Sequence, residues 1–237
     1  MELYIKIIYS LVIVLLLAYL IKKKGYLDDC GIYASSIMAF IILISTEISW
    51  LILLFSFLVL GSLVSKIGYS TKDSMKLGEC KRTIKNVLAN GIMAVLFVLA
   101  YAFGILNYDV ALIGYAGSIA AATSDTFSSE LGVLSKETPR LITTLKKVEK
   151  GTDGGITLFG TLLGLLGSFS IGFLAFLLFK DLNLIWIATV AGLLGNLSDS
   201  LVGALFERKG IINNEHVNFI ATLVGSLSAI LIYTKIF

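Results

Sequence analysis

The 237-residue chain has little of what soluble or secreted domains rely on: one proline, two cysteines, one histidine and only 15% charged residues. So few Cys and His side chains make no recognisable zinc-binding set. Cys30 and Cys80 fall in predicted cytoplasmic loops, where a disulfide is not expected, so both are predicted to be inert. With one proline and no long polar tract, we expect a single domain over residues 1–237.

Apolar sequence is what the chain has in quantity. It is 57% hydrophobic, whereas soluble domains are about 45–50% apolar and about 25% charged. The first apolar run is followed by three lysines and not by a small-residue cleavage site, so no cleavable signal is expected. The predicted fold class is an all-α, polytopic membrane helix bundle with about eight spans of the length that crosses a bilayer, at residues 3–21, 31–46, 48–65, 87–104, 110–134, 155–179, 184–206 and 217–236.

The basic residues are distributed unevenly between the predicted loops. Loops 22–30, 66–86, 135–154 and 207–216 hold all but three of the 19 Lys and Arg. The positive-inside rule therefore places these loops in the cytoplasm and both termini outside. We expect a cell-membrane protein with residues 1–65 as aliphatic scaffold spans and residues 82–220 as the catalytic region.

Two predicted spans carry carboxylates, which are costly inside a membrane and indicate function. Asp125 and Glu130 lie in span 110–134, and Asp199 lies in span 184–206 within SDSLVGALFERK, a stretch similar to SDTFSSELGVLSK around Asp125. Five residues turn an ideal helix by about 140°, so Asp125 and Glu130 need not converge. Asp125 and Asp199 are the better pair. The alternative is a buried carboxylate paired with Lys or hydroxyls for packing.

A basic loop and a glycine turn follow the Asp125 span. The Lys and Arg side chains of this loop either only reflect the positive-inside rule, which sets the orientation in the membrane, or contact a phosphate. The turn precedes an apolar helix, where backbone N–H groups can bind an anion, although Thr152 or Asp153 can equally be a plain N-cap. Arg82 could simply anchor a helix end, and Asn90 could join helices. The candidate phosphate- or nucleotide-binding residues are Arg82, Asn90, Lys136, Arg140, Lys146, Lys147, Gly151, Thr152, Gly154, Gly155, Asn214 and Asn218.

Intramembrane carboxylates beside cations and glycines fit Mg²⁺ shared with substrate phosphates. That inventory suits phosphoryl or nucleotidyl transfer to a lipid acceptor. The alternative of another class is an ion-coupled transporter using Asp125 and Asp199. The polar residues gather at one side of the membrane and spans 1–3 carry no polar lining, which favours the enzyme. The expected partners are a lipid substrate, a nucleotide and the bilayer, with no nucleic acid.

The block 124–155 resembles the integral membrane family that includes plant phytyl-phosphate kinase and its archaeal and animal relatives. The shared pattern is D-T-x-x-S-E-x-G-x-L-S, then P-R-x-I-T-T, then V-x-x-G-T-x-G, here Asp125 to Ser135, Pro139 to Thr144 and Val148 to Gly154. More distantly, the order of Asp, basic loop and glycines resembles CTP-dependent dolichol kinases and phosphatidate cytidylyltransferases.

The resemblance implies a kinase that transfers phosphate from CTP or another nucleoside triphosphate to an isoprenyl monophosphate of the phytyl or geranylgeranyl type. A CTP-dependent cytidylyltransferase or a polyprenol kinase remains the alternative. In the implied roles, Asp125 and Asp199, with Glu130 as a further ligand, bind Mg²⁺. The loop cations neutralise phosphate, residues 151–155 cradle it, and Asn90, Asn214 and Asn218 orient the substrate.

Overall fold

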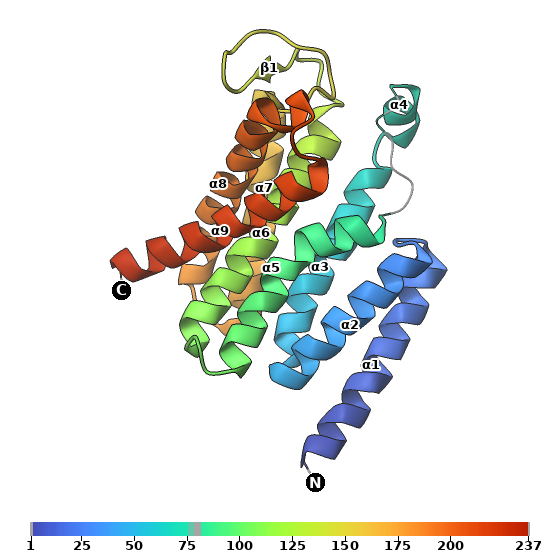
Figure 1. Cartoon of the computed structure of the whole chain (residues 1–237), viewed down its shortest axis with the longest axis vertical. Helices are drawn as coiled ribbons and strands as arrows, with labels where there is room; N and C mark the ends of the chain where they lie inside the picture. The colour runs from blue at the N-terminus through green and yellow to red at the C-terminus, as the bar shows by residue number, and fades with distance from the viewer. Residues whose placement is uncertain (1, 76, 78–81, 237) are drawn as a thin grey trace.

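A computed structural model describes residues 2–75, 77 and 82–236 (Figure 1). Cys80 lies outside the described residues, and Cys30 is an exposed free thiol. The described chain folds into a helix bundle, so the predicted all-α class is confirmed. Its α-helices are α1 (Glu2–Lys24), α2 (Asp29–Ser45), α3 (Ile48–Lys66), α4 (Tyr69–Ser74), α5 (Ile84–Ala102), α6 (Tyr108–Gly132), α7 (Leu158–Phe179), α8 (Asn183–Leu205) and α9 (Asn214–Ile236).

A helix lies at each of the eight predicted spans, while the short helix α4 was not predicted. By length and apolar composition, six of the described helices could cross a membrane: α1, α3, α5, α7, α8 and α9. Helix α2 is apolar but only 17 residues long. Helix α6, which carries both Asp125 and Glu130, is not among the six. The most polar long helix is thus the one that depends most on its protein neighbours.

Helix α6 is the centre of the bundle, in contact with α3, α5, α7, α8 and α9. All of its residues from 111 to 124 are buried. Small side chains allow the close approach, as is usual between membrane helices. A Cβ atom on Gly117 would lie 2.7 Å from the carbonyl oxygen of Gly225 in α9, so only glycine fits at this crossing.

The two ends of the bundle differ. At one end, aromatic rings pack around Trp50, whose carbonyl oxygen accepts a hydrogen bond from the Tyr115 hydroxyl at 2.5 Å. At the other end, where α4 also lies, a hairpin pairs β1 (Arg140–Leu141) with β2 (Gly155–Ile156) (Figure 1). Lys150 Nζ ties this hairpin to the end of α6 by donating to the carbonyl oxygens of Val133, at 3.0 Å, and Ser135.

Candidate functional site

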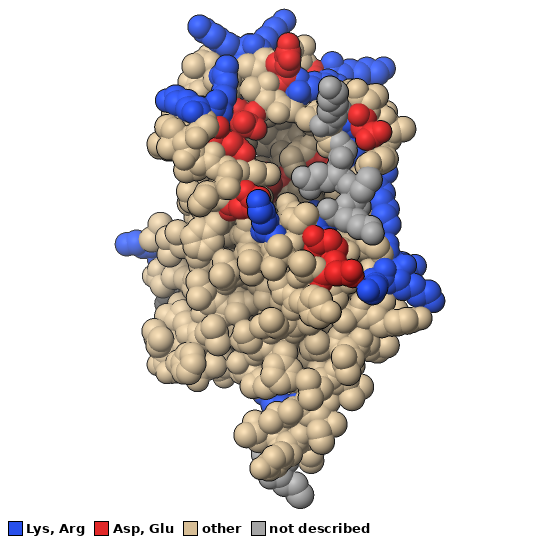
Figure 2. All heavy atoms as spheres, turned by 45° about the vertical axis from the view of Figure 1, so that its right-hand side comes forward, with Lys and Arg blue, Asp and Glu red and all other residues tan. Residues whose placement is uncertain are grey.

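A cavity of about 350 Å³ lies at the end of the bundle that carries the hairpin. Its wall comes from α4, α5, α6, α8, α9 and the loop between α6 and α7. Figure 2 shows a hollow at this end, with Asp and Glu side chains around it. The cavity brings together residues that lie far apart in the sequence.

Most of the predicted site residues line this cavity. Those predicted from intramembrane charge, from the glycine turn and from the asparagines at helix ends are all present. They are Arg82, Asn90, Asp125, Glu130, Gly151, Thr152, Gly154, Gly155, Asp199, Asn214 and Asn218.

The predicted loop cations are the exception. Lys136, Arg140, Lys146 and Lys147 are exposed and do not line the cavity. Arg140 instead donates from Nη1 to the carbonyl oxygen of Leu145 at 3.0 Å, which closes the hairpin loop. The structure therefore does not bring these four predicted residues to the cavity, because a loop rich in Lys and Arg does not show which way its side chains turn.

The carboxyl groups of Asp125 in α6 and Asp199 in α8 lie side by side in the cavity, close enough for direct interaction. The two helices approach so closely here that a Cβ atom on Gly195 in α8 would lie only 2.5 Å from the Cβ atom of Ala121 in α6. Oδ2 of Asp199 is buried and accepts no hydrogen bond from a described residue. Two carboxylates this close repel each other unless a cation or a proton lies between them.

Acidic side chains outnumber basic ones on the described wall of the cavity. Asp153 and Glu207 join the three predicted carboxylates, whereas the described cations are Lys72 and Arg82. A polyphosphate would be repelled by this wall unless a divalent cation accompanied it.

The residues present fit Mg²⁺ only as a shared site. Among the residues placed by the structure, no group of three or more His, Cys, Asp or Glu side chains is arranged to hold a metal ion. Mg²⁺ usually keeps several waters and is bound by one or two carboxylates plus substrate phosphates. The Asp125–Asp199 pair, with the unpartnered Asp199 oxygen, meets that requirement.

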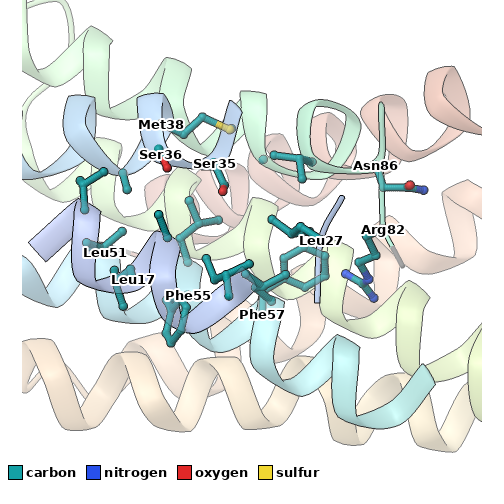
Figure 3. A pocket seen from close by; sticks show the side chains of 18 residues that line it. Leu17, Leu27, Ser35, Ser36, Met38, Leu51, Phe55, Phe57, Arg82 and Asn86 are labelled. Atoms are coloured by element: carbon teal, nitrogen blue, oxygen red, sulfur yellow. The ribbon is translucent and has the colours of Figure 1, made fainter. Parts of the chain in front are cut away.

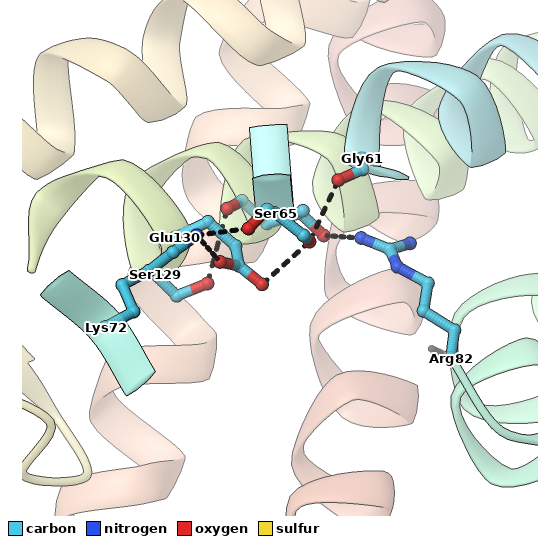
Figure 4. Close-up of polar contacts among 7 residues, drawn as sticks. Gly61, Ser65, Lys72, Arg82, Ser129 and Glu130 are labelled. Carbon is cyan, nitrogen blue, oxygen red and sulfur yellow. Dashed lines mark hydrogen bonds and ion pairs between the residues drawn. The ribbon is translucent and has the colours of Figure 1, made fainter. Parts of the chain in front are cut away.

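Glu130 has a different environment from the one predicted (Figure 4). Its Oε1 accepts from the Ser65 hydroxyl at 2.8 Å, and its Oε2 lies 2.5 Å from Lys72 Nζ. Lys72 is 1% exposed and also donates to the Ser65 carbonyl oxygen at 2.6 Å. Both Glu130 oxygens thus already have protein partners, an ion pair to Lys72 and a hydrogen bond from Ser65, and these contacts join α3, α4 and α6. The structure does not place Glu130 as a free ligand beside the Asp125–Asp199 pair.

Arg82 is held between α3 and α6. Its guanidinium lies 5.0 Å from the centre of the Phe57 ring. Its Nη2 is 3.5 Å from Thr126 Oγ1, and Figure 4 shows the Arg82 side chain reaching this polar cluster. A Cβ on Gly61 would lie 2.4 Å from Nη2, so glycine makes room for the guanidinium. The Arg82 backbone is fixed as well, because its carbonyl oxygen accepts from Asp28 N–H at 3.1 Å. Arg82 thus presents a positioned cation within electrostatic reach of Asp125.

Helix α5 brings two asparagines to the cavity, Asn86 and Asn90. Asn86 Oδ1 accepts from the Thr83 backbone N–H at 2.8 Å, which completes a capping box at the start of α5. Asn90 Nδ2 donates to the Asn86 carbonyl oxygen at 3.0 Å. Their one-turn spacing puts them on one face of the helix.

The glycine turn is built for contact with α8. Gly154 has φ +74°, and a Cβ there would lie 2.6 Å from the Ser200 carbonyl oxygen. The cap of α7 is Thr157, whose side chain accepts from Gly160 N–H at 2.9 Å, and not Thr152 or Asp153. Gly155 N–H already donates to the Thr152 carbonyl oxygen. The turn therefore shapes the wall of the cavity more than it supplies free amides.

Several cavity residues were missed from the sequence. Asn86 could have been found from its face shared with Asn90, and Glu207 from its place in the segment similar to that around Asp125. Nothing in a basic loop marks Lys72 as buried. The polar cavity residues outside the predicted set are Lys72, Asn86, Thr126, Ser128, Ser129, Thr157, Asn196, Ser200 and Glu207.

Comparisons with known proteins agree with this architecture. The family described as integral membrane protein DUF92 matches residues 12–226. An uncharacterized membrane protein of Methanocaldococcus jannaschii is 56% identical over 98% of this chain and 97% of its own length. Protein PGR of Arabidopsis thaliana is 31% identical over 93% of this chain and 94% of its own. The chloroplastic protein VTE6 of Arabidopsis thaliana is 31% identical over 76% of this chain and 57% of its own. No solved structure matches.

Proposed function

This chain belongs to the integral membrane protein family DUF92, and from that membership and the cavity we propose that it is a Mg²⁺-dependent lipid kinase embedded in the membrane. It transfers the terminal phosphate of CTP or another nucleoside triphosphate to an isoprenyl monophosphate of the phytyl or geranylgeranyl type, giving the diphosphate. The resemblance of residues 124–155 to the phytyl-phosphate kinase family supports the reaction. Distant relatives similar to this chain include VTE6 and PGR.

The observation that carries the proposal is the adjacency of Asp125 and Asp199 inside a polar cavity with Arg82 at its wall. Phosphoryl transfer needs mainly positioning and charge stabilisation, with little covalent chemistry from the protein. In this assignment the two carboxylates hold Mg²⁺. The ion, when bound, neutralises the phosphates against an otherwise acidic wall.

The chain's own residues then position the two substrates. Arg82 binds a phosphate oxygen, and Asn90, Asn214 and Asn218 orient the substrates from α5 and α9. An oxygen of the acceptor monophosphate forms a bond to the terminal phosphorus of the donor. The bond from that phosphorus to its bridging oxygen breaks, and the electron pair leaves with the nucleoside diphosphate. The acceptor oxygen is already ionised at neutral pH, so no His or Cys base is required.

The cavity is placed on the cytoplasmic side of the cell membrane in this proposal. Support comes from the basic loops, which gather mainly at the cavity end of the molecule (Figure 2). Nucleotides are available on that side. The lipid acceptor reaches the cavity sideways from the bilayer.

The test is product analysis with purified full-length protein in detergent micelles or liposomes. The protein is incubated with Mg²⁺, each nucleoside triphosphate and geranylgeranyl monophosphate or the corresponding alcohol. An isoprenyl diphosphate is the expected product. A CDP-lipid would replace the proposal with cytidylyltransfer, and phosphorylation of the alcohol alone with polyprenol kinase activity. Ion flux without turnover would replace it with transport.

A further inference from the structure

A second cavity, of about 70 Å³, lies between α1, α2, α3 and α5, the part of the chain predicted to be plain scaffold. Its lining is almost wholly apolar, with Leu17 from α1, Met38 from α2, and Leu51 and Phe57 from α3 (Figure 3). We call this cavity the tail groove. Lipid-facing helices need no such space between them, because membrane helices otherwise pack until their side chains fill the interface.

The tail groove and the polar cavity share two residues, Arg82 and Asn86. In Figure 3 these two lie at one end of the groove, and Leu17 and Leu51 lie at the other. Phe57 packs against the Arg82 guanidinium from the groove side. The same guanidinium is near Thr126 and Asp125 on the polar side. The Arg82 guanidinium therefore lies at the boundary between the polar cavity and the apolar tail groove.

From this continuity we infer that the tail groove binds the first carbons of the acceptor's single hydrocarbon chain, with its phosphate at Arg82. The inference rests on the proposed function and names the binding site of the acceptor's chain. An engineered apolar cavity of roughly 150 Å³ holds one benzene ring, so this smaller groove holds only a few carbons. The rest of the chain lies along the lipid-exposed surface of the bundle.

The groove supplies orientation more than affinity. A chain leaving the bilayer for the groove moves from one apolar environment to another, so the hydrophobic effect gains little. Fixing the carbons next to the phosphate instead aligns the attacking oxygen with the donor. The protein therefore selects for the presence of a chain next to the phosphate, and total chain length matters little once the groove is filled.

The test blocks the groove with Leu17→Trp and uses Leu16→Trp as the matched control, because Leu16 is the next residue on α1 but is 57% exposed and does not line the groove. The kcat/KM values are compared for methyl monophosphate, whose single carbon leaves the groove empty, and for the monophosphate of four isoprene units, which fills it. Leu17→Trp is expected to lower the preference for the long acceptor by about tenfold, whereas Leu16→Trp keeps the wild-type preference. Equal preferences in all three proteins, with the wild type active, would overturn the groove and leave the kinase proposal standing.

A binding measurement keeps the inference testable if the wild type shows no turnover, an outcome that would count against the proposed function alone. An alkyl monophosphate with a diazirine a few carbons from the phosphate is photolysed with the full-length protein in micelles, and the label is mapped by mass spectrometry. Labelling of Leu17, Met38 or Leu51 that geranylgeranyl monophosphate competes away is expected. The inference would be refuted if labelling of the groove were reduced only by added phospholipid, or if the label were found only on residues outside the groove.

Discussion

The two ends of this bundle are built in opposite ways. At the Trp50 end, Tyr101, Tyr108, Tyr115 and Phe179 pack ring against ring, and the Trp50 side chain is fully buried. At the cavity end, α5 and α6 continue into polar and acidic side chains that surround an open volume together with residues of α4, α8 and α9.

The difference indicates that the aromatic end stabilises the fold and that the cavity end destabilises it. The aromatic end buries large side chains without unpaired charge, which favours folding. The cavity end places Asp125 beside Asp199 and leaves an Asp199 oxygen without a partner among the described residues, and both features disfavour folding. Such an arrangement persists when function requires it. Substitutions at the two ends should therefore separate stability from activity.

The largest loss of stability is expected from Trp50→Ala. Emptying this space should lower the free energy of unfolding by about 3–5 kcal/mol, measured by denaturant unfolding in detergent. Trp186→Ala is the matched control, since Trp186 is 36% exposed in α8, and should cost less than about 1 kcal/mol. Equal losses for the two tryptophans would contradict the assignment of stability to the aromatic end.

The largest loss of activity is expected from Asp199→Asn or Asp125→Asn. Either change removes half of the carboxylate pair and should lower kcat by roughly a hundred- to a thousand-fold. The thermal unfolding midpoint should stay level or rise, because repulsion between the carboxylates is relieved. Full kinase activity in both variants would remove the pair from the mechanism.

Lys72→Met tests an intermediate case, a structural ion pair at the edge of the cavity. It leaves Glu130 without its counter-ion and should cost about 3 kcal/mol of unfolding free energy. The double variant with Glu130→Gln removes both charges and should recover at least half of that loss. A double variant whose loss equals the sum of the two single losses would show that the two residues act independently.

Gly61→Ala should reduce activity at little cost in stability. The added Cβ meets the end of the flexible Arg82 side chain at 2.4 Å, so the guanidinium moves and the helix does not. We expect kcat/KM to fall about tenfold, or about 1.4 kcal/mol. In an Arg82→Ala background the same change should add no further loss, and an additive loss would show that Gly61 acts by another route.

The smallest effect is expected from Lys146→Ala with Lys147→Ala. Both side chains are exposed and outside the cavity, so kcat/KM at physiological ionic strength should stay within about twofold of the wild type. A loss as large as that from Asp199→Asn would show that Lys146 or Lys147 takes part in substrate binding or catalysis.

Local sequence was sufficient for the helices. Apolar runs of membrane length gave eight helix positions that the structure confirms, because backbone groups in lipid must be paired within a helix. It was also sufficient for pairing Asp125 with Asp199, since two polar faces on tightly packing helices have few other partners. Boundaries differ by a few residues, and the short elements α4, β1 and β2 depend on contacts that the sequence pattern does not show.

By itself, then, the sequence determined an all-α membrane bundle and a carboxylate-bearing site at the end with the basic loops. Only the tertiary structure decided which charges face that site. It turned Glu130 toward Lys72, left Lys146 and Lys147 exposed, and placed beside the cavity a groove in the supposed scaffold that shares Arg82 and Asn86 with it. The reason is physical: burial cost determines that a charge in the membrane needs a partner, but only packing determines which partner lies within reach.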